Sequence, residues 1–106
     1  MKATSKYEFR PLSPEFMPGP LDVICARGKF ASNHTGNVRY KLIIHMNVQK
    51  YSDAESKLER SFIVSSIVDS IREASPDGGF VKKRKGRWYD AGDCYAREKV
   101  GQRYEY

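Results

Sequence analysis

The chain contains few of the residues on which metal binding and catalysis usually depend. Among its 106 residues are two cysteines and two histidines, and none of them has the short paired spacing of a structural zinc motif. We therefore expect no metal and no other cofactor. Cys25 and Cys94 are expected to be reduced and buried. Neither His34 nor His45 has a serine, cysteine or carboxylate at the spacing of a catalytic dyad or triad, so we predict that the protein is not an enzyme.

Long apolar runs and a hydrophobic N-terminal segment are also missing. Hydrophobic residues make up 40% of the chain and charged residues 30%. No run approaches the roughly 18 residues of a membrane-spanning helix. Residues 1–5 lack the apolar stretch of a secretory signal behind them. These absences predict a protein that binds no membrane and is nuclear or cytoplasmic. A chain of this length can hold one modest core.

Proline is concentrated at the N-terminus. Four of the five prolines in the chain are Pro11, Pro14, Pro18 and Pro20. Their spacing forbids a continuous helix and predicts an extended leader over residues 1–20, followed by a single globular domain over residues 21–106. The leader is unusually apolar, so it can dock on the domain or on a partner. Its apolar residues are Tyr7, Phe9, Leu12, Phe16 and Met17.

The first half of the domain predicts a strand, a loop and a helix. Residues 21–26 form a short apolar run typical of a strand, and the turn-rich loop 27–37 follows. Asn37 is expected to be the N-cap of a helix over residues 38–51. The loop has the glycines and the lysine of a phosphate cradle, but it lacks the spacing of nucleotide-binding motifs, so a structured loop is the simpler interpretation. The apolar stripe of the helix is Tyr40, Ile43, Ile44, Val48 and Tyr51.

The second half predicts a long helix, a hairpin and a final helix. The S-x-x-E pattern at residues 56–59 is typical of a capping box, and the helix that it starts must end before Pro76. Residues 80–89 place strand-forming residues on both sides of Lys85-Gly86, which favours a tight hairpin turn. Asp93 is expected to cap the last helix. The buried face of that helix is marked by Ala96, Val100 and Tyr104.

The predicted hairpin carries most of the positive charge. Residues 82–87 hold five cations in six positions, and residues 82–103 carry a net charge of +5 out of +6 for the whole chain. A charged finger of this kind typically meets phosphate. Residues 82–85 also resemble a nuclear import signal. Trp88, the one tryptophan, either packs the hairpin on the helices or stacks on a base.

The predicted fold is α+β, in the order strand, helix, helix, β-hairpin, helix, which is winged-helix-like. The helix before the hairpin offers few polar residues for reading base edges. We therefore expect the hairpin, the loop and the last helix to supply the contacts. The predicted nucleic-acid-binding residues are Lys82, Lys83, Arg84, Lys85, Arg87, Arg97, Lys99, Arg103, Arg27 and Lys29.

Two functions fit this pattern. The first is a nucleic-acid-binding domain, with double-stranded DNA favoured, that holds phosphates through the hairpin and the last helix. The second is a protein-interaction module whose basic face binds an acidic partner. Neither fixes an oligomeric state. The internal ion pairs weighed against these contacts are Arg97 with Asp93 or Glu98, and Arg27 or Arg39 with Asp22 or Asp90.

Six short blocks of the sequence, in this order, resemble those of a known family. They are Asp22-Val23-Ile24-x-x-Arg27-Gly28, Asn33-x-x-Gly36-Asn37, Ile67-Val68-x-x-Ile71-Arg72, Gly79-Phe80-Val81, Trp88-Tyr89-Asp90-Ala91-Gly92-Asp93 and Ala96-Arg97-x-Lys99-x-x-Gln102. Residues 20–103 are thus similar to an uncharacterised small domain that is abundant in diatoms and related algae and is classified only as a domain of unknown function. The resemblance implies no activity. The family commonly has glycine where this chain has Ala26, so the end of this strand is less free to adopt an unusual backbone.

Overall fold

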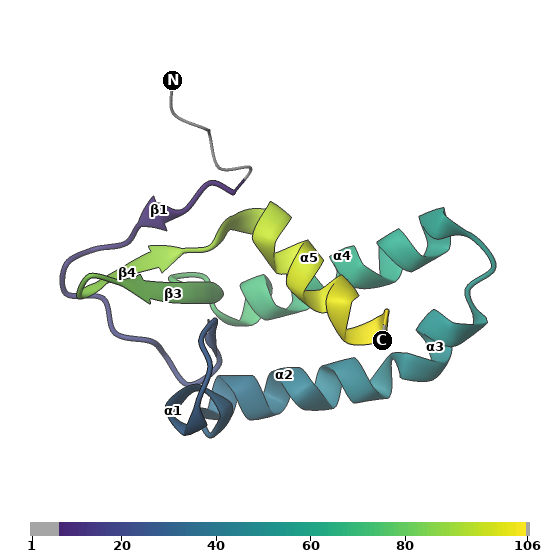
Figure 1. Ribbon diagram of the computed structural model, residues 1–106, viewed down its shortest axis with the longest axis horizontal. Coiled ribbons are helices and arrows are strands. Elements are labelled where there is room, and N and C mark those ends of the chain that lie inside the picture. The colour runs from purple at the N-terminus through teal and green to yellow at the C-terminus, as the bar shows by residue number, and fades with distance from the viewer. Residues whose placement is uncertain (1–6, 106) are drawn as a thin grey trace.

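A computed structural model describes residues 7–105, with a small sheet at one end and the long helices extending from it (Figure 1). The strands are β1 (Arg10–Pro11), β2 (Val23–Ile24), β3 (Phe80–Arg84) and β4 (Arg87–Asp90). The helices are α1 (Lys29–Ser32), α2 (Thr35–Met46), α3 (Val48–Asp53), α4 (Lys57–Ala74) and α5 (Gly92–Tyr104). The predicted α+β class is confirmed.

The sheet has the strand order β1-β4-β3-β2. β3 and β4 form the predicted antiparallel hairpin, and β2 lies parallel to β3. Parallel pairing requires a long crossover, which here contains α1 to α4. The leader contributes β1, which pairs antiparallel with β4. The leader therefore completes one edge of the sheet.

The turn of the hairpin lies where the sequence places it. Lys85 and Gly86 both have positive φ, at 50° and 78°. Two consecutive left-handed residues are the mark of a type I′ turn, whose twist matches that of the flanking strands. The hairpin tip is thus a tight turn.

Two of the three predicted helices are confirmed, and the remaining one is divided. The Ser56 hydroxyl accepts a hydrogen bond from Glu59 N and starts α4, which ends two residues before Pro76. The helix expected over residues 38–51 begins earlier and is interrupted at Asn47, which separates α2 from α3. The Asn47 side-chain amide donates to the Ile43 carbonyl oxygen at 2.8 Å. Such a local hydrogen bond competes with the helical backbone and accounts for the break.

The predicted caps of α2 and α5 are wrong. His34 holds the N-cap position of α2, and Asn37 lies one turn further on with its side chain buried. That side chain bonds both backbone groups of Ile24 instead of the helix terminus. α5 begins after Ala91, and Asp93 lies in its first turn, where a carboxylate is still favoured by the helix dipole.

The sheet packs a hydrophobic cluster on each face, because neighbouring residues of a strand point to opposite sides. Phe80 joins the larger cluster with the buried sides of α2, α4 and α5. Val81 and Trp88 join a smaller one with Ile24 and Ala31, against which the leader packs. Trp88 is therefore a packing residue.

The two cysteines differ from the prediction that both are buried. Cys25 is buried in the larger cluster, and Cys94 is exposed on the first turn of α5. Both are free thiols. Cys25 follows β2 directly, and the pairing of β2 with β3 places it in the core. Cys94 lies on the side of α5 that faces away from the buried residues Ala96 and Val100.

Candidate nucleic-acid interface

The parallel pairing of β2 and β3 brings two basic segments to one end of the sheet. The chain leaves β2 in the same direction as it leaves β3, so the loop at residues 26–28 follows the hairpin towards its tip. Cys25 N donates to Val81 O at 2.8 Å, and Lys82 Nζ donates to Cys25 O at 3.4 Å. Figure 1 shows α1 and the hairpin tip at the same end of the molecule. Arg27 and Lys29 are both exposed there.

The four cations nearest the hairpin tip are exposed, and they are divided between the two faces of the sheet. Lys83 lies opposite Trp88, with its Nζ 5.7 Å from the centre of the indole ring. Arg84 lies opposite Arg87 on the other face. The exposed cations of the hairpin are Lys83, Arg84, Lys85 and Arg87. A surface that curves around the tip therefore meets cations on both sides.

The leader touches two of these cations. Arg84 Cζ lies 5.4 Å from the centre of the Phe9 ring. Arg87 donates from Nε and Nη2 to the Leu12 carbonyl oxygen at 3.2 and 2.9 Å. These contacts hold the guanidinium groups without neutralising them, since neither an aromatic ring nor a carbonyl carries a net charge. The leader orders the cations of the hairpin and leaves their positive field intact.

Lys99 of α5 and Lys82 of β3 converge on one place. Burial raises the pKa of the Cys25 thiol to about 11, and the ammonium groups of Lys99 and Lys82 act in the opposite direction. Lys99 Nζ also lies 5.7 Å from the centre of the Tyr40 ring. Both lysines are half-buried. They extend the positive charge of the hairpin towards the side of α5 that faces α2.

The remaining two predicted cations of α5 lie away from the hairpin. Arg103 is exposed near Tyr40, whose pKa is raised by burial and lowered in part by that guanidinium. Arg97 lines a pocket with Lys57 and Arg60 of α4. Two residues along a helix correspond to about 200° of rotation, so Arg97 and Lys99 point to different sides of α5. Arg97 therefore lies on the side of α5 that faces α4, and its contact with nucleic acid stays a prediction.

The acidic residues expected to pair with Arg27 or Arg39 are bound elsewhere. The buried Asp22 carboxylate accepts from the backbone N–H groups of Gly19 and Gly79 at 2.6 and 2.7 Å. Asp90 accepts from Arg72 Nη2 at 3.2 Å. The predicted ion pairs of Arg27 and Arg39 with these acids are therefore wrong. Neither Asp22 nor Asp90 neutralises the positive charge of these two arginines.

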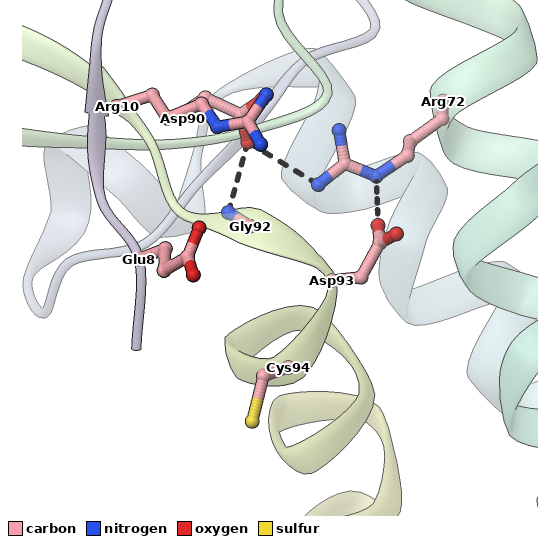
Figure 2. Close-up of a pocket in the computed structure, with 7 residues that line it drawn as sticks. All are labelled: Glu8, Arg10, Arg72, Asp90, Gly92, Asp93 and Cys94. Carbon is pink, nitrogen blue, oxygen red and sulfur yellow. Dashed lines mark hydrogen bonds and ion pairs between the residues drawn. The ribbon is translucent and has the colours of Figure 1, made fainter. Parts of the chain in front are cut away.

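Arg72, at the end of α4, joins the hairpin to α5 and was not predicted to do so. Its Nε lies 2.7 Å from Asp93 Oδ1, while Asp90 also accepts from Gly92 N at 2.9 Å (Figure 2). Because Asp93 is held by Arg72, the predicted pairing of this acid with Arg97 is wrong. The sequence signal for this clasp is the pair of acids Asp90 and Asp93 on either side of a glycine, since two neighbouring carboxylates need a cation from elsewhere in the chain.

A pocket of about 400 Å³ surrounds this clasp. Gly92 has φ +83°, and a Cβ placed on it would lie 2.9 Å from Glu8 O, so the leader crosses closely above it. The residues that line the pocket are Glu8, Arg10, Arg72, Asp90, Gly92, Asp93 and Cys94 (Figure 2). Acids and cations alternate in it, and two of its three acids are bound by Arg72. Its geometry is that of a structural joint between leader, hairpin, α4 and α5.

Two kinds of site are absent from the described part of the chain. Within residues 7–105, no three His, Cys, Asp or Glu side chains are placed to hold a metal ion. No helix over the same residues is both long and apolar enough to cross a bilayer. His34 Nε2 lies 2.9 Å from the Gly19 carbonyl oxygen, and His45 is exposed near the end of α2.

The fold and the basic surface define a small α+β domain with a cationic hairpin and a leader docked on its sheet. The sequence model of a family described as a domain of unknown function, DUF6824, matches residues 22–104, and the chain belongs to that family. No curated protein and no solved structure matches it.

Proposed function

We propose that this domain binds nucleic acid, with double-stranded DNA favoured, and holds it mainly through backbone phosphates. The observation that carries the proposal is the placement of two basic segments at one end of the sheet. Parallel pairing of β2 with β3 puts Arg27 and Lys29 at the end where the hairpin exposes its cations. Clustered lysine and arginine side chains on one face are the electrostatic footprint of phosphate binding.

The proposed contact surface has a centre and a flank. Its centre consists of the exposed cations Lys83, Arg84, Lys85, Arg87, Arg27 and Lys29. Lys82 and Lys99 form the flank and are half-buried, so they contribute mainly through their field. Arg103 lies further along α5, and Arg97 lies on the side of α5 that faces α4, so both would meet only a ligand that wraps around that helix.

The order of two helices followed by a hairpin is also that of winged-helix domains, and we propose that the hairpin acts as the wing. α4 is the helix in the position of a base-reading helix, yet it exposes Leu58 and Phe62. Apolar side chains of that size do not read base edges by hydrogen bonds. We therefore expect binding that depends on phosphates and varies little with sequence. A DNA-binding role would place the protein in the nucleus, and the basic run at residues 82–85 would then act as its import signal. A cytoplasmic location would suit an RNA ligand.

Fluorescence anisotropy of a labelled random duplex, measured over a salt series, tests the proposal. The wild type should bind with an affinity that falls by about 0.9 in log K per log unit of salt for each phosphate contact. Lys83/Arg84/Lys85→Ala should weaken binding by at least tenfold. Lys41/Lys50/Lys57→Ala removes the same charge from exposed positions elsewhere and should bind nearly as the wild type does. Equal losses in the two variants would mean that net charge, not the hairpin, attracts the duplex.

A second candidate is a protein-interaction module whose basic face binds an acidic partner. The observation that favours it is the leader itself, since an extended peptide already lies along β4. Leu12 N donates to Trp88 O at 2.9 Å, and Arg87 holds the Leu12 carbonyl. Addition of a strand to a sheet edge is a common mode of peptide recognition. Anisotropy of a labelled oligoglutamate peptide separates the candidates: tighter binding of that peptide than of duplex DNA would favour this one.

Both candidates are binding functions, and we do not propose catalysis. The two histidines lie at opposite ends of α2, so they do not form a site together. His34 is held at the Gly19 carbonyl and His45 is exposed to solvent.

A further inference from the structure

The leader carries an exposed serine beside the cationic hairpin. The sequence at residues 11–14 is Pro-Leu-Ser-Pro, and Ser13 and Pro14 are both exposed. A proline holds the residue before it in an extended backbone, so Pro14 favours an extended conformation at Ser13. A serine followed directly by proline, in an accessible segment, is the substrate pattern of proline-directed protein kinases. Ser13 therefore has both the sequence and the exposure of a modification site.

The other serine that precedes a proline is protected by the fold. Ser75 is half-buried at the C-cap of α4. Its N–H donates to the Arg72 carbonyl oxygen at 3.2 Å, and its own carbonyl accepts from Gly78 N at 3.1 Å. A kinase would have to unwind the end of α4 to bind this segment. Ser13 lies in a single turn closed by Phe16 N at 2.9 Å, and opening that turn disturbs no helix.

Arg87 of the hairpin already holds the residue that precedes Ser13. Its Nε and Nη2 donate to the Leu12 carbonyl oxygen at 3.2 and 2.9 Å. These contacts use two of the five N–H groups of the guanidinium, so three can reach a further acceptor. The register that pairs Pro11 with Tyr89, continued by two residues, places Ser13 opposite Arg87. In Figure 1 the leader passes the hairpin turn directly after β1.

The Ser13 hydroxyl bonds Glu15 in the unmodified chain. Ser13 Oγ donates to Glu15 Oε2 at 2.6 Å, and Glu15 N donates to Ser13 Oγ at 3.3 Å. Phosphorylation removes the hydroxyl proton and adds a charge of about −1.5 to −2 with three acceptor oxygens. Because the phosphate and the Glu15 carboxylate repel each other, the phosphate turns towards Arg87. A guanidinium pairs with a phosphate through two parallel hydrogen bonds.

We propose that Ser13 is a phosphorylation site and that its phosphate pairs with Arg87, which lowers the positive charge of the hairpin. Ser13 Oγ attacks the γ-phosphorus of ATP held by a proline-directed kinase. The new Oγ–P bond forms as the bond from the γ-phosphorus to the β,γ-bridging oxygen breaks, ADP leaves, and the hydroxyl proton passes to a base of the kinase. The consequence for nucleic acid rests on the proposed function: the added phosphate occupies Arg87 and repels the phosphates of a duplex.

Treatment of the full chain with ATP and a proline-directed kinase of the mitogen-activated class, followed by mass spectrometry of the intact chain and its peptides, tests the site. The wild type should gain one phosphate, on Ser13. Ser13→Ala should gain none, and Ser75→Ala should be modified as the wild type is. A synthetic peptide of residues 7–20 measures how well the same sequence is modified without the fold. A full chain that stays unmodified at Ser13, or one modified at Ser75 instead, overturns the proposal.

A ³¹P NMR titration of the phosphorylated chain tests the contact with Arg87. The guanidinium favours the dianion, so the second pKa of the phosphate should lie below the value of about 6 for a free phosphoserine. In Arg87→Gln this pKa should return to the free value. Lys85→Gln removes a neighbouring exposed cation from the hairpin turn and should keep most of the lowering. Equal pKa values in the wild type and Arg87→Gln would show that the phosphate does not pair with Arg87.

Anisotropy of the labelled random duplex separates this inference from the proposed function. The phosphorylated wild type should bind at least about tenfold more weakly than the unmodified chain at low salt. If the unmodified chain does not bind the duplex, the proposed function fails, while the pairing of the phosphate with Arg87 is still decided by the ³¹P titration. If the unmodified chain binds and phosphorylation leaves its affinity unchanged, the proposed effect of Ser13 on the hairpin is overturned.

Discussion

The side chain of Asn37 bonds both backbone polar groups of Ile24, and thereby takes the place of a strand at the open edge of β2. Its Oδ1 accepts from Ile24 N at 2.8 Å, and its Nδ2 donates to Ile24 O at 2.9 Å. β2 is two residues long and is paired on its other side with β3. One amide group of α2 thus fixes the strand that positions the basic loop.

Replacing Asn37 with alanine should lower the free energy of unfolding by about 2 to 4 kcal/mol, because two buried backbone groups lose their partner. Chemical denaturation of the purified variant measures the effect. Asn33→Ala removes the same side chain from an exposed position and should change stability by about 0.5 kcal/mol or less. Similar stabilities for the two variants would show that the Ile24 contact contributes little.

Gly36 should tolerate no side chain. A Cβ placed on it would lie 1.8 Å from the backbone oxygen of Asp22, a separation that the chain can only relieve by moving α2 away from β2. We expect Gly36→Ala to unfold cooperatively at a much lower denaturant concentration or to fail to fold. Gly101 in α5 has nothing within 4 Å of the corresponding position. Gly101→Ala should therefore stabilise the protein by about 0.5 to 1 kcal/mol, because alanine favours helix. A thermal scan that ranks the two variants the other way would contradict the packing of α2 on β2.

Cys25 should make the protein less stable in alkali. Burial raises the pKa of its thiol from 9.0 to about 11, so between these values the unfolded chain ionises the thiol while the folded chain keeps it protonated. The contribution of the protonated thiol to the free energy of unfolding is complete below pH 9. It is lost as the pH rises towards 11, by up to about 1.4 kcal/mol per pH unit. Urea unfolding of the wild type and of Cys25→Ala, compared across this range, isolates the thiol from the tyrosines. Parallel pH profiles would show that the thiol is not buried.

Removing residues 1–17 should uncover the indole of Trp88. Leu12 and Phe16 pack on the cluster that contains Trp88, and the Phe16 and Trp88 ring centres are 6.4 Å apart. Since Trp88 is the only tryptophan, its emission reports this contact directly and should shift to longer wavelength. Stability should fall by a few kcal/mol, at about 1.5 to 3 kcal/mol for each large side chain that is no longer buried. An unchanged emission maximum would mean that the leader does not cover this face.

Local signals in the sequence were sufficient to predict the hairpin and two of the helices. The positive φ of Lys85 and Gly86, the Ser56 cap and the buried face of α5 all follow from residues close together in the chain. The break at Asn47 depends on one side-chain hydrogen bond that competes with a good apolar stripe. Periodicity carries no information on such competition.

Contacts between distant residues were beyond these signals. The Asp22 carboxylate accepts a hydrogen bond from Gly79 N, 57 positions away, and Arg72 forms ion pairs with Asp90 and Asp93 in two other elements. Charge and spacing alone assigned the wrong arginines to these acids. For the basic surface, the sequence indicated the hairpin correctly as exposed, but only the parallel register of β2 and β3 places Arg27 and Lys29 at its end.

The most direct test of the central claim is NMR mapping of a random DNA duplex titrated into ¹⁵N-labelled protein at about 50 mM salt, where phosphate contacts are strong. The proposed function predicts that the largest shift changes of backbone amides fall in residues 82–87 and 27–29, with little change in α4. Changes confined to α3 and α4, or no change at saturating duplex, would contradict it.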